Sequence, residues 1–140
     1  MEVVYNRNLF YLKDLDTRSY ANGQSSSTPA LMSVIVKDLK PNTKYTVTTD
    51  APLNASGGCD LFADNYPSTP SSAVNGLKPM VPKVITTDSA GAIEMTFRNA
   101  SAAASLYTNI TEIANGKHYV KVEEGDTFTY WTPAPEDILG

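Results

Sequence analysis

The chain has 140 residues, of which 41% are hydrophobic and 19% are charged, so it is long enough for one domain with a hydrophobic core. Its net charge of −4 argues against nucleic acid or an anionic membrane surface as the main partner, because both select clustered Lys and Arg. No apolar run is long enough for a membrane span, and a single cysteine excludes an internal disulfide framework.

Apolar and polar residues alternate with a period of two along much of the chain. This pattern predicts antiparallel strands with one face in the core and one face in water. Within 91–99, for example, Met95 is expected to face the core and Glu94 to face solvent. The strands expected from this pattern, in chain order, lie within residues 31–39, 43–50, 59–64, 82–88, 91–99, 106–113, 117–125 and 126–131.

Pro, Gly, Asn and Asp stand between the expected strands, where turns need a fixed or positive φ. Eight or nine strands with turns at this spacing predict an all-β fold, an antiparallel β-sandwich of the jelly-roll kind. We expect residues 1–140 to form a single domain, with 132–140 as an exit segment or linker.

The last expected strand must end before two prolines. Pro133 and Pro135 lack the N–H that a central strand donates to its neighbour. Trp131, the only tryptophan, is therefore expected to seal the open end of the sandwich or to pack beside Leu9 and Phe10.

The sequence contains no catalytic motif, so the chain is not expected to be an enzyme. One histidine, His118, and one cysteine, Cys59, make a zinc site improbable, and no metal or other cofactor is expected. A structural calcium ion is a weaker hypothesis, because several acids stand near the ends of expected strands. These acids are Asp60, Asp64, Asp88, Glu123, Glu124 and Asp126.

Two long polar stretches, 14–30 and 65–82, show little periodicity and are expected to be irregular loops. Loops of this length are often functional, although a surface excursion without function is equally compatible with the residues. Each contains a tyrosine, whose ring can stack on a sugar or can pack down on the sheet. The candidate ligand-binding residues are Tyr20, Asn22, Gln24, Asp64, Asn65 and Tyr66.

The C-terminal stretch "HYVKVEEGDTFTYWTPAPED", residues 118–137, resembles a segment of phage and prophage proteins of Gram-positive bacteria. In tail, baseplate and minor structural proteins this segment ends a carbohydrate-binding-module-like β-sandwich. The opening "NRNLF", residues 6–10, is similar to the start of such modules. Val122 and Glu124 depart from the pattern, in which Leu and Lys are common. The matching residues are Lys121, Glu123, Gly125, Trp131, Pro133, Ala134, Pro135, Glu136 and Asp137.

This resemblance implies a galactose-binding-like jelly roll on a virion, acting at the host cell surface. Its expected function is to bind cell-wall polysaccharide or teichoic acid of a Gram-positive host and so assist adsorption, beside other phage tail proteins. No nucleic-acid partner and no membrane insertion are expected. The alternative is a structural spacer or docking domain of the tail without sugar affinity, since a fold does not fix a function. An enzyme acting on glycans would need two carboxylates facing each other across the sugar, and the sequence offers no such pair.

Overall fold

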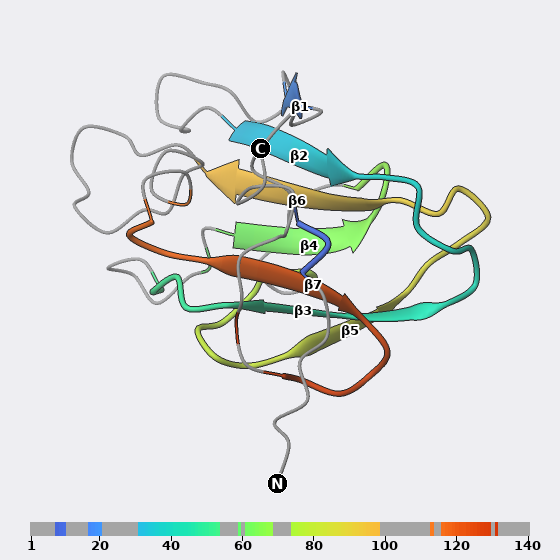
Figure 1. Cartoon of the computed structure of the whole chain (residues 1–140). Helices are drawn as coiled ribbons and strands as arrows, with labels where there is room; N and C mark the ends of the chain where they lie inside the picture. Colours follow the sequence, from blue (N-terminus) through green and yellow to red (C-terminus); the bar gives the residue numbers. More distant parts are fainter. Residues whose placement is uncertain are drawn as a thin grey trace, which may run out of the picture.

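In a computed structural model, the chain forms two antiparallel β-sheets that stack face to face (Figure 1). The structure describes residues 8–10, 17–20, 31–53, 59, 61–68, 74–98, 113, 116–129 and 131. One sheet has the strand order β1-β2-β6-β4, and the other has the order β5-β3-β7. The strands are β1 (Thr17–Tyr20), β2 (Leu31–Val36), β3 (Lys44–Thr49), β4 (Leu61–Asn65), β5 (Lys83–Thr86), β6 (Ile93–Arg98) and β7 (Val120–Glu124). The all-β, antiparallel prediction is confirmed.

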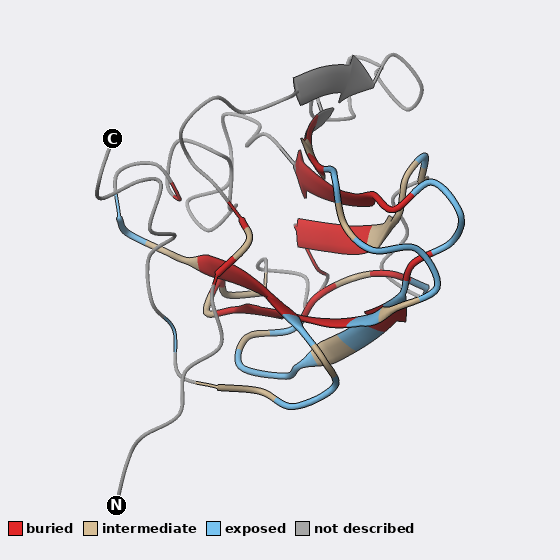
Figure 2. Cartoon of the chain, turned by 45° about the vertical axis from the view of Figure 1, so that its right-hand side comes forward, coloured by how far each residue is buried: buried red, intermediate tan, exposed pale blue. Residues whose placement is uncertain are grey.

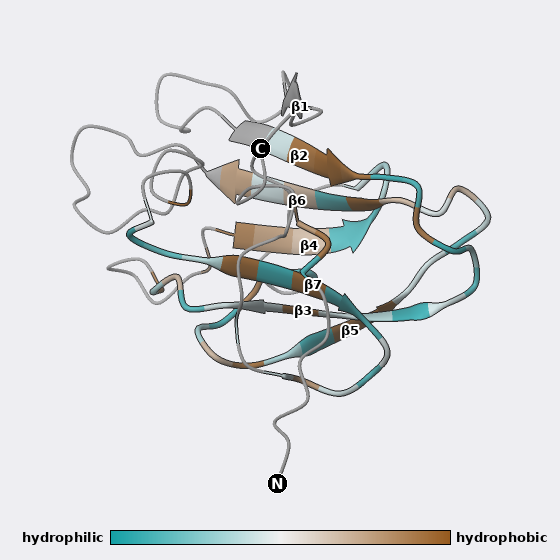
Figure 3. Ribbon diagram, in the orientation of Figure 1, coloured by the Kyte–Doolittle hydropathy of each residue, from teal (hydrophilic) through white to brown (hydrophobic). Residues whose placement is uncertain are grey.

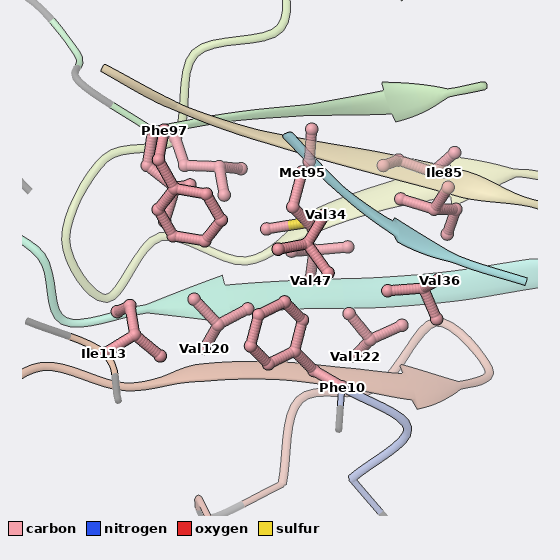
Figure 4. Close-up of a cluster of buried hydrophobic side chains, with 14 of the residues drawn as sticks. Phe10, Val34, Val36, Val47, Ile85, Met95, Phe97, Ile113, Val120 and Val122 are labelled. Atoms are coloured by element: carbon pink, nitrogen blue, oxygen red, sulfur yellow. The ribbon is translucent and has the colours of Figure 1, made fainter. Parts of the chain in front are cut away.

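The hydrophobic core lies between the two sheets. Val34 and Met95 from the first sheet meet Val47 and Val122 from the second, as Figure 4 shows. Phe10 also enters this core, and its ring centroid lies 6.4 Å from that of Phe97. The predicted core residues whose burial is described are all buried, namely Val34, Val36, Tyr45, Val47, Ile93, Met95, Phe97, Val120 and Val122.

Many polar side chains on the outer faces of β2, β3, β6 and β7 are also buried, contrary to the prediction that they face water, whereas the outer face of β5 is exposed at Val84 and Thr86. Figure 3 shows polar and apolar residues alternating along β7, whereas Figure 2 shows nearly the whole strand as buried. Lys121, Glu123 and Glu94 are each 0% exposed. The reason is that non-strand segments cover these faces and supply hydrogen bonds. Thr129 contacts Glu123, and the Ser68 N–H donates to Glu94 Oε1 at 2.7 Å.

The elements differ from the prediction at two places. The stretch 14–30, expected to be irregular, contains β1, which pairs with β2 from Thr17↔Val34 to Tyr20↔Leu31. In the expected strand 126–131, the described residues 126–129 and 131 belong to no strand. Apart from Ile113, the expected strand 106–113 lies outside the described residues.

Residues 8–10 close the edge of β7 that β3 leaves open. The Leu9 N–H donates to the Val122 carbonyl at 2.7 Å. The buried amide of Asn8 extends this contact, because its Nδ2 donates to the Val120 carbonyl at 3.1 Å and its Oδ1 accepts from the Val122 N–H at 3.1 Å. Oδ1 also accepts from the Phe10 N–H at 3.0 Å. A side chain here takes the place of a strand partner, which protects an edge that would otherwise be free.

Candidate functional site

Among the residues predicted to bind a ligand, those that the structure describes lie at two separate places. Tyr20 ends β1 and pairs with Leu31, whereas Asn65 ends β4 and pairs with Ile93. Leu31 pairs with Arg98 at the other end of β6, five residues from Ile93, which is roughly 17 Å along the strand. Strands β1 and β4 are also the two edges of the sheet. Asn22 and Gln24 lie outside the described residues.

Asn65 links the two sheets. Its Nδ2 donates to the Thr86 carbonyl at the end of β5, at 2.9 Å. Its Oδ1 accepts from the Asp88 N–H at 3.2 Å. Both ends of the amide are therefore engaged in the fold, and a ligand would have to compete with these bonds.

The other two predicted residues at this end, Asp64 and Tyr66, are partly buried. Asp64 Oδ1 accepts from the Asn65 N–H at 2.8 Å, and the Tyr66 N–H donates to the Ala92 carbonyl at 3.0 Å. Their role in ligand binding stays a prediction.

The structure presents a different aromatic surface beside the start of β7. The Tyr119 and Trp131 rings lie 5.3 Å apart between centroids, at an interplanar angle of 39°. Trp131 is 42% exposed. It therefore packs on Tyr119 and does not bury itself as the expected seal of the sandwich. Met80, which is 52% exposed, joins the pair by accepting a hydrogen bond from the Tyr119 hydroxyl at its sulfur, at 3.0 Å. We call Met80, Tyr119 and Trp131 the aromatic surface.

The local sequence explains why these side chains meet. Val120 and Val122 face the core, so the alternation of a strand directs Tyr119 to the outer side. Met80 reaches it from the segment before β5, where its N–H donates to the Thr49 carbonyl at 2.8 Å. Its backbone has a φ of 61°, the left-handed conformation that marks a sharp turn for a residue with a side chain.

Polar groups stand next to the aromatic surface. Asp50 Oδ1 accepts from the Tyr119 N–H at 2.8 Å and lies 3.5 Å from His118 Nδ1. Burial, and secondarily the negative charge of Asp50, raise the pKa of the Tyr119 phenol above its ordinary value. The phenol therefore keeps its proton at neutral pH. An exposed ring beside a carboxylate and an imidazole offers both the apolar face and the hydrogen-bonding groups that a sugar ring requires.

A buried polar bridge lies next to this surface on the outer face of β7. Lys121 Nζ donates to Thr129 Oγ1 at 2.9 Å. That hydroxyl donates to Glu123 Oε1 at 2.6 Å, and the Thr129 N–H donates to Glu123 Oε2 at 3.3 Å. Burial lowers the pKa of Lys121, and the charge of Glu123 opposes this shift only in part. We call Lys121, Glu123 and Thr129 the polar bridge.

The described residues contain no group of three or more His, Cys, Asp or Glu side chains placed to hold a metal ion. The calcium hypothesis therefore gains no ligand cluster from this part of the chain, and Asp60 lies outside it. Glu124 instead pairs with Lys40 at 2.9 Å.

Comparison with known proteins gives no relative: no family model, no curated protein and no solved structure matches the chain. In the part of the chain that the structure describes, no helix has the length and apolar character needed to cross a membrane.

The aromatic surface was missed by sequence reasoning because its members are far apart in the chain. Trp131 was singled out as the only tryptophan but was expected to be buried. The dipeptide His118-Tyr119 before an alternating strand was the available signal, since the position before Val120 must face outward. Nothing in the sequence indicated that Met80 would reach it.

Proposed function

We propose that this chain is a non-catalytic carbohydrate-binding module of a phage or prophage tail or baseplate protein. It would bind host cell-surface polysaccharide and assist host adsorption. The observation that carries the proposal is the contact of the exposed Trp131 ring with the partly buried Tyr119, beside Asp50 and His118. The C-terminal and N-terminal resemblances described above support the phage origin, the location on the virion, and a Gram-positive polysaccharide or teichoic acid as the ligand.

The arrangement of the strands supports the finer fold assignment, a galactose-binding-like jelly roll. From β2 to β7, each strand belongs to the sheet opposite that of the strand before it. Antiparallel strands that alternate between two facing sheets are typical of jelly rolls. In this proposal the sandwich is a rigid support, and the ligand binds to side chains on its surface.

Binding at one such surface is expected to be weak. Two members of the aromatic surface are exposed: Trp131 at 42% and Met80 at 52%. Side chains this exposed do not enclose a ligand as a deep pocket does. Many copies on one virion would convert weak single contacts into stable attachment. The assay must therefore present the domain in multivalent form.

The test compares binding of the multimerised domain to purified Gram-positive cell-wall polysaccharide and teichoic acid. We expect Trp131→Ala to reduce binding at least tenfold while lowering the melting temperature by only a few degrees, because the ring is part exposed. The matched control is Val84→Ala, since Val84 is 45% exposed on β5. Tyr20→Ala and Tyr66→Ala test the two residues predicted from the sequence.

Three results would contradict the proposal in different ways. If Trp131→Ala binds as well as wild type, the aromatic surface is not the site. If only Tyr20→Ala or Tyr66→Ala loses binding, the site lies with those tyrosines. If the wild-type domain binds no glycan even in multivalent form, the spacer or docking alternative is favoured.

A further inference from the structure

Trp131 packs against Tyr119 beside β7, although Trp131 itself belongs to no strand. The described residues 126–129 and 131 belong to no strand, and the Thr129 N–H donates to the Glu123 carboxylate on β7. Side-chain contacts with β7 therefore help to fix the position of these residues. Contacts between the described residues of this segment and β7 include the polar bridge at Thr129 and the ring contact at Trp131.

The spacing of these contacts follows the strand. Tyr119, Lys121 and Glu123 lie on one face at alternate positions, about 7 Å apart. Thr129 contacts the last two, and Trp131, two residues further along, contacts the first. The segment thus returns along the outer face of β7 in the opposite direction.

Thr129 suits this position because a hydroxyl both accepts and donates a hydrogen bond. It accepts from the ammonium group of Lys121 and donates to the carboxylate of Glu123 at the same time. Both charged residues are 0% exposed and Thr129 is partly buried, so the bonds form in a partly buried environment, where hydrogen bonds to charged groups are strengthened. The lowered pKa of Lys121 agrees with this burial.

We propose that Thr129 is a positioning residue: its hydroxyl, held between Lys121 and Glu123, anchors this part of the chain on β7 and so sets the Trp131 ring against Tyr119. Its effect on ligand binding rests on the function proposed above. Its effect on the position of Trp131 does not, and can be measured without any ligand.

The experiment uses the fluorescence of Trp131, which is the only tryptophan in the chain. Thr129→Val keeps the shape of the side chain but removes both hydrogen bonds of the hydroxyl. We expect a red-shifted emission, stronger quenching by acrylamide, and binding to cell-wall polysaccharide weakened at least fivefold. Thr129→Ser restores the hydroxyl and should behave as wild type. The control is Thr86→Val, because Thr86 is exposed on β5.

A second variant covers the case in which Thr129→Val does not fold. In Lys121→Met/Glu123→Leu, apolar side chains replace the buried ion pair, an exchange that folded proteins often tolerate. The same red shift is expected, because the Thr129 hydroxyl no longer bonds to residues 121 and 123.

The outcomes separate the two proposals. Unchanged emission and quenching in a folded Thr129→Val protein overturn the positioning role. So does a Thr129→Ser protein that is as perturbed as Thr129→Val, since this would show that the hydroxyl does not by itself set the position of Trp131. A red shift in Thr129→Val together with no glycan binding by wild type supports the positioning role and refutes the carbohydrate-binding function.

Discussion

Two threonines on the outer face of β3 allow a matched test of how this face is stabilised. Thr46 and Thr48 are each 0% exposed and point to the same side of one strand. The Thr46 hydroxyl donates to the Gly125 carbonyl at 2.7 Å. The Thr48 hydroxyl has no hydrogen-bond partner in the part of the chain that the structure describes. Valine has nearly the same shape as threonine, so each substitution removes a hydroxyl and leaves the packing in place.

The two substitutions should change stability in opposite directions. Thr46→Val loses a hydrogen bond and should lower the free energy of unfolding by about 1 to 2 kcal/mol. Thr48→Val removes a buried hydroxyl that gains nothing in return and should raise it by about 1 kcal/mol. For a chain of 140 residues, each kcal/mol corresponds to a change in melting temperature of about 3 °C.

The assay is urea and thermal unfolding of both variants and wild type, followed by circular dichroism and by Trp131 fluorescence. Coincident transitions by the two probes would justify a two-state free energy. A Thr46→Val protein at least as stable as Thr48→Val would refute the reasoning. It would mean that hydrogen bonds on the outer face do not distinguish these two sites.

Three further predictions concern other parts of the fold. Asn65→Ala should lower the free energy of unfolding by about 1 to 3 kcal/mol in urea unfolding, because it removes both side-chain hydrogen bonds between β4 and the end of β5. A variant as stable as wild type would show that these bonds are not needed. Gly91→Ala should destabilise the protein more than Gly116→Ala in thermal unfolding. Both glycines have positive φ, but only at Gly91 would a new Cβ clash with the Leu39 carbonyl oxygen. Equal decreases in melting temperature would contradict this contact. Burial lowers the pKa of Lys121 from 10.5 in the folded state. Between that lowered pKa and 10.5, the unfolded state therefore binds more protons than the folded state. The contribution of Lys121 to stability must then rise with pH in that window. Wild type should therefore gain stability relative to Lys121→Met as the pH rises toward 10.5, and a constant difference between their unfolding free energies would argue against the shift.

The sequence predicted the core strands well because alternation reports directly which side of a strand is apolar. Val47 and Val122 are in the core for this reason. Alternation does not report what covers the other side, so the burial of Lys121 and Glu123 could not be foreseen. β1 was missed because Thr17–Tyr20 is polar, and its strand is recognisable only through its pairing with β2.

The candidate site was harder to predict because its contacts are not local. The amide of Asn65 was expected to be available to a ligand, but its partner Thr86 is 21 residues away and belongs to the other sheet. Trp131 was expected to end a strand, and its true position depends on a segment that returns over β7 without a ladder. Long-range side-chain hydrogen bonds of this kind leave no periodic signal in the sequence.

The attachment of residues 8–10 and of Thr129 to the same strand has a mechanical consequence. Asn8 and Leu9 hold the edge of β7, and Thr129 holds its outer face. A pull applied to the chain before residue 8 and after residue 131 would be transmitted from one attachment to the other through β7. The sheet β1-β2-β6-β4 contacts the loaded segment through the Phe10 ring, which packs against Phe97. Tension along the polypeptide would thus load the hydrogen bonds to β7 first and the other strands of the sandwich later.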